Sequence, residues 1–558
     1  MIYVTKKQTE QQVLDHFENL EIDGVGYETT TPKVVWYWNS GGGDADPSEY
    51  LTIKAREDNC TIRFNWGYSN GGSEPSPVSS GTIYYSLDNG STWSPQSVNG
   101  GEDVTLATLD NGDEIMLKGN LYVTEYKVGY ISATNTNTYE SASFDVFGNP
   151  LSLVDSDNFA NINDISEYSS VFYGLFSLTN VVNASKLSLP ATALSDSCYE
   201  NMFQNCYYLT SAPALPATNL GSECYSSMFS GCTSLISAPS LPATALTTYC
   251  YYYMFAGCES LTQAPSLPAT ALTDSCYLGM FTNCTGLTTA PVLSAMELGT
   301  ACYQEMFAGC VSLTQAPALP ATAITYFNNC YYGMFSYCTG LVSAPALPAT
   351  TLSYACYGHM FYGCTGLTTA PQLPATSIAG MCYYYMFGGC TSLESVPSTL
   401  PATTTYSQCY ESMFEGCTSL ADAPDIAATS AAGSCFYHMF SGCTSLTGAP
   451  STLSSTTAYG MNCYGGMFAG CTSLTTSPDI FGTFVTNYAF VDMFNGCSSL
   501  SAISCFVLGA SDHPELNMKN WVIGVAQSGT FRKNASAGNW ATGVNGIPAN
   551  WTVVDVTV

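Results

Sequence analysis

Hydrophobic residues recur along most of this 558-residue chain with a period of 26 residues. A Met-Phe pair marks each unit, and a degenerate first copy centres on Phe176. A repeat of about 20–50 residues is typical of solenoids, in which every unit packs against its neighbours and cannot bury its apolar side chains alone. We therefore predict a solenoid of about 13 repeats over residues 151–500. The paired phenylalanines are Phe203, Phe229, Phe255, Phe281, Phe307, Phe335, Phe361, Phe387, Phe414, Phe440, Phe468 and Phe494.

The unit has the consensus C-Y-x-x-M-F-x-G-C-T-S-L-T-x-A-P-x-L-P-A-T-x-L. Its compact aromatic part, Cys224–Phe229 in one copy, predicts one or two helical turns that end at Gly231. The segment Leu235–Leu241 has the spacing of a short strand that meets a turn. Pro239 and Pro242 lack an N–H donor, so they fit only the end of such a strand or the turn after it. The predicted fold class is a repeat solenoid of short parallel strands plus helical turns.

Residues 31–150 alternate between apolar and polar side chains in the manner of β-strands, with turn-rich runs between them. Six or seven strands of this kind predict a β-sandwich-like domain. Within it, Ser86–Trp93 matches the Asp-box pattern S-x-D-x-G-x-T-W, and its Asn-Gly pair predicts a tight structural hairpin. The clearest strand candidates are Val34–Trp38, Leu51–Lys54, Thr61–Trp66 and Thr82–Ser86.

The two ends of the chain differ from the repeat. In residues 1–30, Thr9 and Gln12 resemble a capping box, which predicts an amphipathic N-terminal helix that acts as an attachment segment and not a signal peptide. Residues 501–558 regain tryptophans and cations, and we expect them to form a C-terminal β cap over the last hydrophobic face of the solenoid.

Eleven repeats contribute a pair of cysteines spaced eight residues apart, such as Cys198 and Cys206. Eight helical residues span about 12 Å, beyond the roughly 7 Å limit for a disulfide. Zinc sites favour close CxxC pairs with histidine, and the chain has four His. We therefore expect free cysteines stacked in buried ladders, and neither a metal nor any other cofactor. Cys60 and Cys505 stand outside this pattern.

Charge narrows the classes of partner. The formal net charge is −30, and no Lys or Arg lies between Lys186 and Lys519. Such a surface cannot neutralise phosphates, which argues against nucleic acid and against anionic membranes. No apolar run reaches the roughly 18 residues that a membrane span needs. The sequence also contains no recognisable catalytic motif and no fixed pair of carboxylates, so we do not expect an enzyme.

The two residues between the Cys-Tyr and Met-Phe pairs vary from copy to copy, while their neighbours stay fixed. Their bias to Tyr, Ser and Gly resembles an antibody paratope, in which Tyr supplies contact area at low entropic cost. The alternative is drift of exposed loops, and both readings stay open here. We expect His359 and His438, at matching positions, to face solvent. The candidate ligand-binding residues are Tyr252, Tyr253, Tyr332, His359, Tyr384, Tyr385, Tyr437 and His438.

The M-F-x-G-C-T-S-L core resembles the BspA-type leucine-rich repeat over about residues 170–500. That family occurs in surface adhesins of gut and oral anaerobes, and it supplies no catalytic residues. The L-P-A-T and C-Y-x-x-M-F elements also look like those of fibre proteins of gut bacteriophages, including crAss-like phages. The resemblance implies a protein that displays a repeat surface for binding.

Two functions follow from the resemblance. In the first, the chain is a phage virion structural protein, a head or tail fibre or decoration protein, that adheres to a host-cell or mucus ligand. In the second, it is a bacterial cell-surface adhesin. The lack of an export signal and of a lipid-anchoring cysteine before Cys60 favours the first, as do reduced thiols. We expect contacts with other virion proteins through the N-terminal region and a host glycan or protein as ligand; a homotrimer and a ligand-free spacer stay open.

Overall fold

The computed structural model describes residues 49–65, 81–99, 102–121, 128–156, 158–322, 324, 329–454, 460–482, 485, 487–508 and 513–557. The chain divides into two compact units, Met1–Gly43 and Asp44–Val558, and every described residue belongs to the second. The predicted helix within residues 1–30 and the predicted strand Val34–Trp38 therefore lie outside the described residues.

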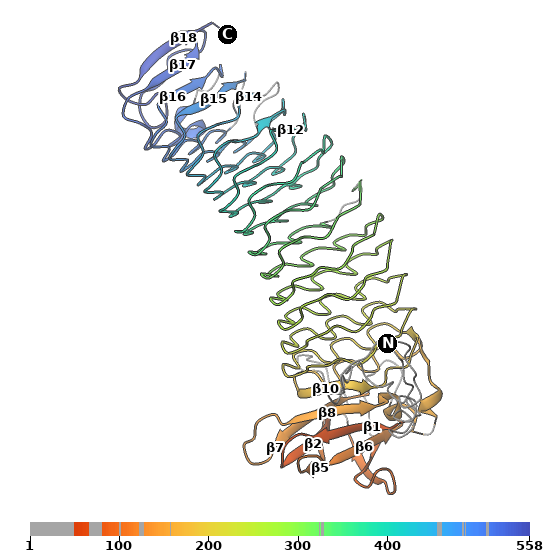
Figure 1. Ribbon diagram of the computed structural model, residues 1–558. Coiled ribbons are helices and arrows are strands. Elements are labelled where there is room, and N and C mark those ends of the chain that lie inside the picture. Colours follow the sequence, from red (N-terminus) through yellow and green to blue (C-terminus); the bar gives the residue numbers. More distant parts are fainter. Residues whose placement is uncertain are drawn as a thin grey trace, which may run out of the picture. The chain divides into compact units, whose positions relative to one another are not determined.

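Two sheets precede the repeats (Figure 1). One has six strands in the order β10-β8-β1-β6-β3-β4, and the other has three in the order β5-β2-β7. The strands predicted around residues 51–54, 61–66 and 82–86 are confirmed as β1, β2 and β3. A sandwich packing of the two sheets stays a prediction. Their strands are β1 (Leu51–Ala55), β2 (Cys60–Asn65), β3 (Gly81–Ser86), β4 (Ser94–Val98), β5 (Asp103–Leu109), β6 (Glu114–Gly119), β7 (Tyr130–Asn135), β8 (Ser143–Gly148) and β10 (Asn180–Leu187).

The Asp-box forms the predicted hairpin between antiparallel β3 and β4. The Asp88 carboxylate accepts hydrogen bonds from the Thr92 N–H at 2.8 Å and from the Ser86 hydroxyl at 2.8 Å. Asn89 and Gly90 both have positive φ, as a tight two-residue turn requires. The bonds from Thr92 and Ser86 lower the pKa of Asp88, so the carboxylate stays ionised while it fixes the turn.

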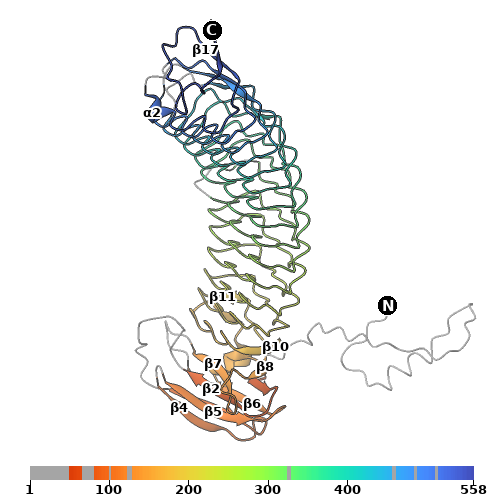
Figure 2. The same ribbon diagram turned by 90° about the vertical axis from the view of Figure 1, so that its left-hand side faces the viewer.

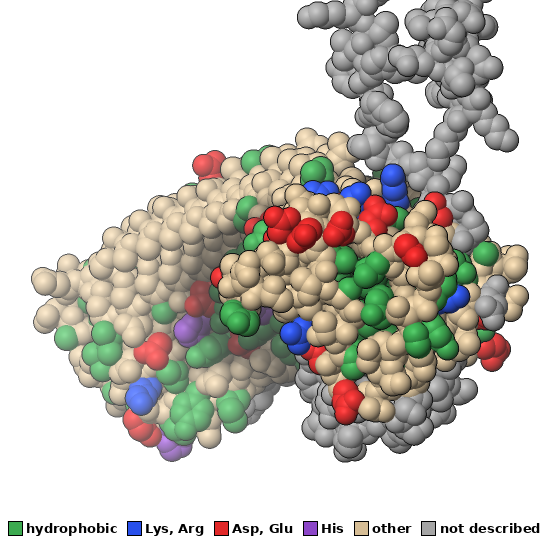
Figure 3. Space-filling view, turned by 90° about the horizontal axis from the view of Figure 1, so that it is seen from below, with side chains coloured by type: hydrophobic (Ala, Val, Ile, Leu, Met, Phe, Trp, Pro, Cys, Tyr) green, Lys and Arg blue, Asp and Glu red, His purple; other side chains and the backbone are tan. Residues whose placement is uncertain are grey.

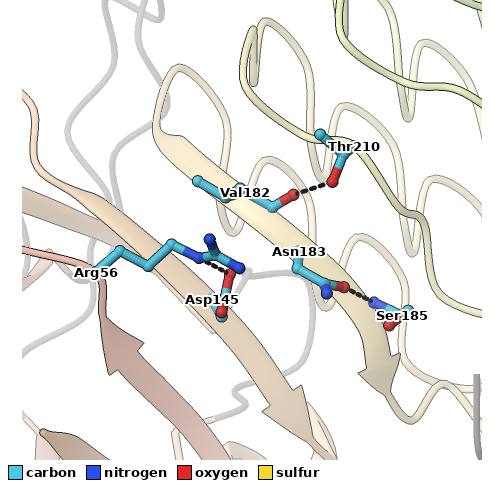
Figure 4. A network of polar contacts seen from close by, with 6 residues as sticks. All are labelled: Arg56, Asp145, Val182, Asn183, Ser185 and Thr210. Atoms are coloured by element: carbon cyan, nitrogen blue, oxygen red, sulfur yellow. Dashed lines mark hydrogen bonds and ion pairs between the residues drawn. The ribbon is translucent and has the colours of Figure 1, made fainter. Parts of the chain in front are cut away.

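Strand β10 joins the sheet to the repeats, because it pairs in parallel with β8 and continues into the first coil. Figure 4 shows this junction, where Arg56 Nε lies 2.7 Å from Asp145 Oδ1. On the other side of β10, the Thr210 hydroxyl donates to the Val182 carbonyl at 2.9 Å. The first coil of the solenoid thus contains a strand of the preceding sheet, and this sheet covers one end of the stack.

The compact aromatic part of each coil is a run of tight turns, so the predicted helical turns are not confirmed. Every fourth residue has a left-handed backbone: in one coil φ is 57° at Glu223, 51° at Ser227 and 76° at Gly231. A helix keeps φ negative throughout, so these recurrent sign changes exclude it. Gly231 does not end a helix but is the third left-handed position of its coil.

Successive N–H groups in the turns alternate between two kinds of hydrogen-bond partner, a carbonyl of the same coil and a carbonyl of the next coil. Met228 N–H bonds to the Tyr225 carbonyl three residues back, at 3.2 Å. Phe229 N–H bonds to the Met254 carbonyl of the next coil, at 2.9 Å. The same alternation recurs in the described coils, so the buried backbone is satisfied partly within a coil and partly between coils. This pairing holds successive coils in register, as the stack in Figure 2 shows.

The opposite side of each coil carries the predicted parallel β contacts, which are very short. Ser211 pairs with Ser237 through a single bridge, and Pro239 follows at once. Because proline has no N–H, the ladder cannot extend past it. A continuous parallel sheet of five strands, β14 to β18, forms at the C-terminal end. The remaining elements are η1 (Pro150–Leu153), η2 (Phe159–Asn161), β9 (Asp164–Ile165), β11 (Ala193–Leu194), β12 (Thr399–Leu400), β13 (Asp425–Ile426), β14 (Thr452–Ser454), β15 (Thr476–Phe481), β16 (Ala502–Cys505), α2 (Pro514–Asn517), β17 (Thr530–Asn534) and β18 (Thr552–Val556).

Identical side chains stack along the core. The Phe203 and Phe229 rings lie 5.6 Å apart and nearly parallel, and the Tyr199 and Tyr225 rings lie 5.8 Å apart. All 25 cysteines are free and buried, which confirms the predicted ladders. The second cysteine of most units donates to the carbonyl of a Phe, as Cys258 Sγ does to Phe229 at 3.2 Å. The sulfur of this second cysteine thus fills core volume and also donates to a carbonyl.

The C-terminal segment covers the last ring of the phenylalanine stack. The Trp521 ring packs on Phe494 with centroids 5.8 Å apart, is fully buried, and donates its N–H to the Gly546 carbonyl. The Trp551 N–H donates to the Ala526 carbonyl at 2.9 Å. Large aromatics with satisfied N–H groups close the hydrophobic end that an unfinished stack would expose.

Replacing Gly442 with Ala tests the left-handed positions. Gly442 has φ of 74°, and an added Cβ would meet only ordinary contacts, so the cost is backbone strain. We expect the free energy of unfolding to fall by about 1–2 kcal/mol, measured by denaturant titration. Gly433→Ala is the control, because Gly433 lies outside the left-handed range and has room for a Cβ. Equal effects of the two substitutions would contradict the strain argument.

Thiol titration tests the cysteine ladders. Burial raises the pKa of Cys250, Cys284 and Cys356 to about 12, so thiolate is scarce as well as inaccessible. We expect a thiol reagent such as dithionitrobenzoate to find no reactive group in the native protein at pH 8. In guanidinium chloride it should find all 25. A stoichiometric fast phase in the native protein would contradict this packing.

Candidate ligand-binding surface

The eight candidate residues occupy the two variable positions of the turn segment, and all are partly buried. Because the coils stack in register, these positions lie on the same edge of the array. We call the set of Tyr252, Tyr253, Tyr332, His359, Tyr384, Tyr385, Tyr437 and His438 the aromatic row. The second variable position is also the left-handed one, with φ of 54° at His359 and 52° at Tyr385.

His359 lies at the centre of the row, among four tyrosine rings. Its centroid is 5.2 Å from those of Tyr332, Tyr362, Tyr384 and Tyr385, and it stacks on Tyr385 with an interplanar angle of 12°. Burial by these rings lowers the pKa of His359, so the neutral imidazole is favoured. His359 is therefore only partly exposed to solvent, because three successive coils supply its aromatic neighbours.

Several rings of the row lie across the next coil, where a glycine makes room for them. A Cβ added at Gly279 would stand 2.4 Å from the Tyr253 ring, and one at Gly358 would stand 2.9 Å from the Tyr332 ring. Gly465 meets the Tyr437 ring in the same way. At these positions a large side chain on one coil goes with a glycine on the next, whereas His359 is followed by Tyr385. Drift of exposed loops stays open as the alternative reading of the variation.

Glu305 connects the first part of the row to the second. The Tyr253 hydroxyl donates to Glu305 Oε2 at 3.1 Å across an intervening coil. Burial raises the pKa of Tyr332, and Glu305 raises it further, which places this carboxylate close to both rings. Tyr252 packs edge-on against Tyr253 with centroids 4.6 Å apart. The row thus continues across the coil that lacks an aromatic pair.

Two carboxylates of one coil, Glu411 and Glu415, lie between the tyrosine pair of the preceding coil and Tyr437 and His438 of the following one. Glu415 Oε1 is 3.9 Å from His438 Nδ1. Glu415 Oε2 is buried. Burial acts against ionisation of Glu415, but hydrogen bonds from His438, Ser412 and Tyr385 outweigh it and lower the pKa of this carboxyl group. Burial raises the pKa of Glu411. Burial and then Glu411 raise the pKa of Tyr384 to about 12, which shows how closely the acids and the rings interact.

The structure thus brings together all eight predicted residues, and it adds side chains that the sequence argument did not select. Tyr362 and Tyr249 were not among the candidates, although each contacts a candidate ring. Glu305, Glu411 and Glu415 were also not among the candidates. A comparison of neighbouring copies for large–small pairs would have pointed to the row. His438 lies beside Glu415 with its side chain 31% exposed.

Elsewhere in the described part of the chain, fewer polar and aromatic side chains lie close together. A cavity of about 500 Å³ lies on the proline side of two adjacent coils, between Pro345, Leu347 and Pro371. Among the described residues, no cluster of three or more His, Cys, Asp and Glu is placed to hold a metal ion. Within the same part of the chain, the search for a helix long and apolar enough to cross a membrane finds none.

Comparison with known proteins gives one match. The family model described as BspA type leucine-rich repeat region matches in six copies, over residues 133–262, 196–342 and 356–500. Searches of curated proteins and of solved structures give no match. The comparisons thus bear out the leucine-rich-repeat part of the resemblance, and they provide no link to phage fibre proteins.

The environment of His359 predicts its titration. Since burial lowers its pKa, the folded state prefers the neutral ring; this stability is complete above the unfolded pKa of about 6.5 and is lost as pH falls through the lower folded value. We expect NMR of histidine-labelled protein to show a pKa below about 6.5 for the resonance that His359→Gly removes. A value at or above that would contradict the four-ring environment.

Proposed function

Since the chain belongs to the BspA-type leucine-rich-repeat family, whose repeats indicate a surface- or adhesion-type protein, we propose that it is a phage virion structural protein, a head or tail fibre or decoration protein, whose aromatic row adheres to a host-cell or mucus ligand. The protein acts by binding and not by catalysis. Its N-terminal region contacts other virion proteins.

The observation that carries the adhesion function is the presence of large rings at strained positions. Tyr253, His359 and Tyr385 have left-handed backbones, where the equivalent residues of other coils are Gly279, Gly333 and Gly466. A bulky residue with such a backbone costs about 1–2 kcal/mol relative to glycine. Because other coils carry glycine at this position, the fold does not require a ring there, which favours a binding role for the rings. A half-buried aromatic surface is typical of a binding site.

The thiols support assembly inside a cell. All 25 cysteines are free, although the ladders place the cysteines of adjacent coils next to one another. Free thiols persist where glutathione and thioredoxin keep them reduced, as in the cytoplasm in which virions assemble. A protein that folds during export meets oxidants before its core closes. The alternative, a bacterial cell-surface adhesin, has the same repeat family in its favour.

Immunogold electron microscopy distinguishes these two locations. With antibody against the repeat array and a culture of the source, we expect gold on free phage particles, at the head or at the tail. Gold on cell envelopes, with unlabelled particles in the same field, would overturn the virion proposal and leave the adhesin.

A binding assay tests the row itself. We expect the purified protein to bind host cells or mucus, and the Tyr384→Ser/Tyr385→Ser protein to bind at least about tenfold more weakly, because two anchoring rings are lost. Serine is compatible with the left-handed position, as Ser412 shows. The control is Val292→Ser/Met296→Ser, which removes two apolar side chains that are 82% and 53% exposed outside the row. Equal loss in both proteins would contradict the assignment.

A further inference from the structure

We propose that the part of the row around Glu411 and Glu415 recognises lysine and arginine side chains on a basic segment of the partner protein. This inference rests on the proposed adhesion function and names its ligand as a polypeptide that carries positive charge. It depends on three features of the described residues: the two carboxylates, the rings that flank them, and the absence of internal cations from the array.

The two carboxylates are held without a permanent counter-ion. Both are half-buried, and the side chain of Glu415 is 33% exposed. Removing a carboxylate from water is unfavourable unless a cation or hydrogen-bond donors replace the lost hydration. His438, 3.9 Å from Glu415, is the one basic side chain paired with them in the described structure. The other groups that lie against Glu415, Ser412 and Tyr385, are neutral hydroxyls, so no permanent positive charge compensates this carboxylate.

The array cannot supply the missing cation from its own sequence. No Lys or Arg lies between Lys186 and Lys519, so every carboxylate in that stretch is without a lysine or arginine neighbour in sequence. The described ion pairs with Lys or Arg lie in the N-terminal sheets and at the C-terminal end, as Lys54–Glu114 and Lys533–Asp555 do. In Figure 3, acidic and histidine side chains lie among hydrophobic ones on the array. The summed field of such a surface attracts positive ligands and repels anionic glycans.

Aromatic rings border the carboxylates on both sides. Tyr384 and Tyr385 precede Glu411 along the array, and Tyr437 follows it, stacked on His438 with centroids 4.2 Å apart. A tyrosine face attracts an ammonium or guanidinium group, with about 0.5–2 kcal/mol for each good contact. The alkyl stem of lysine or arginine also packs well on such rings. Rings and acids together therefore match a cationic side chain more completely than a neutral sugar, whose hydroxyls can donate to a carboxylate but bring no positive charge.

Peptide binding tests this specificity. The probe is a fluorescein-labelled Gly-Lys-Gly-Lys-Gly-Lys peptide, and its binding to the full chain is followed by anisotropy at low salt. We expect saturable binding that weakens as salt is added. The same peptide with acetylated lysines should bind at least about tenfold more weakly, as should the charged peptide to Glu411→Gln/Glu415→Gln, because each change removes a charge-assisted contact.

A charge-matched variant controls for diffuse attraction. Glu297→Gln/Glu394→Gln has the same net charge as the row variant but changes exposed acids at other positions of the unit. We expect it to bind the charged peptide within about twofold of the unmodified chain, since screened charges away from the site act weakly. Equal loss in both variants would overturn a specific site. Near-UV circular dichroism reports folding, and Glu415→Gln alone serves if the double variant unfolds.

The remaining outcomes also decide the matter. Equal binding of the acetylated peptide, no binding of the charged peptide, or binding of the neutral oligosaccharide chitotetraose in its place would overturn the cationic ligand. Failure of the proposed adhesion function would give a different result: the protein would bind the charged peptide but would attach to neither host cells nor mucus. A glycan-type result with intact adhesion would leave the proposed function standing and remove only this inference.

Discussion

The hydrogen bond from one coil to the next is the interaction on which the rest of the structure depends. Phe229 N–H to the Met254 carbonyl is one member of a series that recurs through the turn segments. It exists because a left-handed residue at every fourth position aims alternate N–H groups along the array. Without this pairing, buried N–H and C=O groups of the turns would have no hydrogen-bond partner, and neither the register nor the ladders would form.

Register converts a short repeat into a continuous core. Tyr stacks on Tyr and Phe on Phe, and a cysteine thiol donates to a Phe carbonyl at each step. These contacts involve no charge, which explains how the array persists for over 300 residues without a lysine or arginine. Stability comes from apolar burial and nearest-neighbour packing. Because the fold of the array does not depend on ion pairs, its surface carboxylates are available to bind a ligand.

The same register couples the surface positions of neighbouring coils. A ring at Tyr332 requires a glycine at Gly358, and a ring at Tyr437 requires one at Gly465. At these two places a substitution that enlarges the row is constrained by a residue that lies a full repeat away in sequence. His359 illustrates the result: its environment is composed of rings from three coils, and its protonation follows from their packing and not from any neighbouring charge.

The sequence by itself determined the period, the solenoid class, the buried free cysteines and the Asp-box hairpin. These follow from local chemistry: a 26-residue spacing, cysteines that recur at fixed positions of an apolar unit, and an Asn-Gly turn. Only the tertiary structure decided that Cys224–Phe229 is a chain of turns, since φ at Glu223 and Ser227 depends on bonds to the next coil. It also decided which rings and acids meet, because Glu305, Glu411 and Tyr362 join the row through stacking. Contacts between coils arise from register, and a single repeat contains no information about its neighbours' side chains.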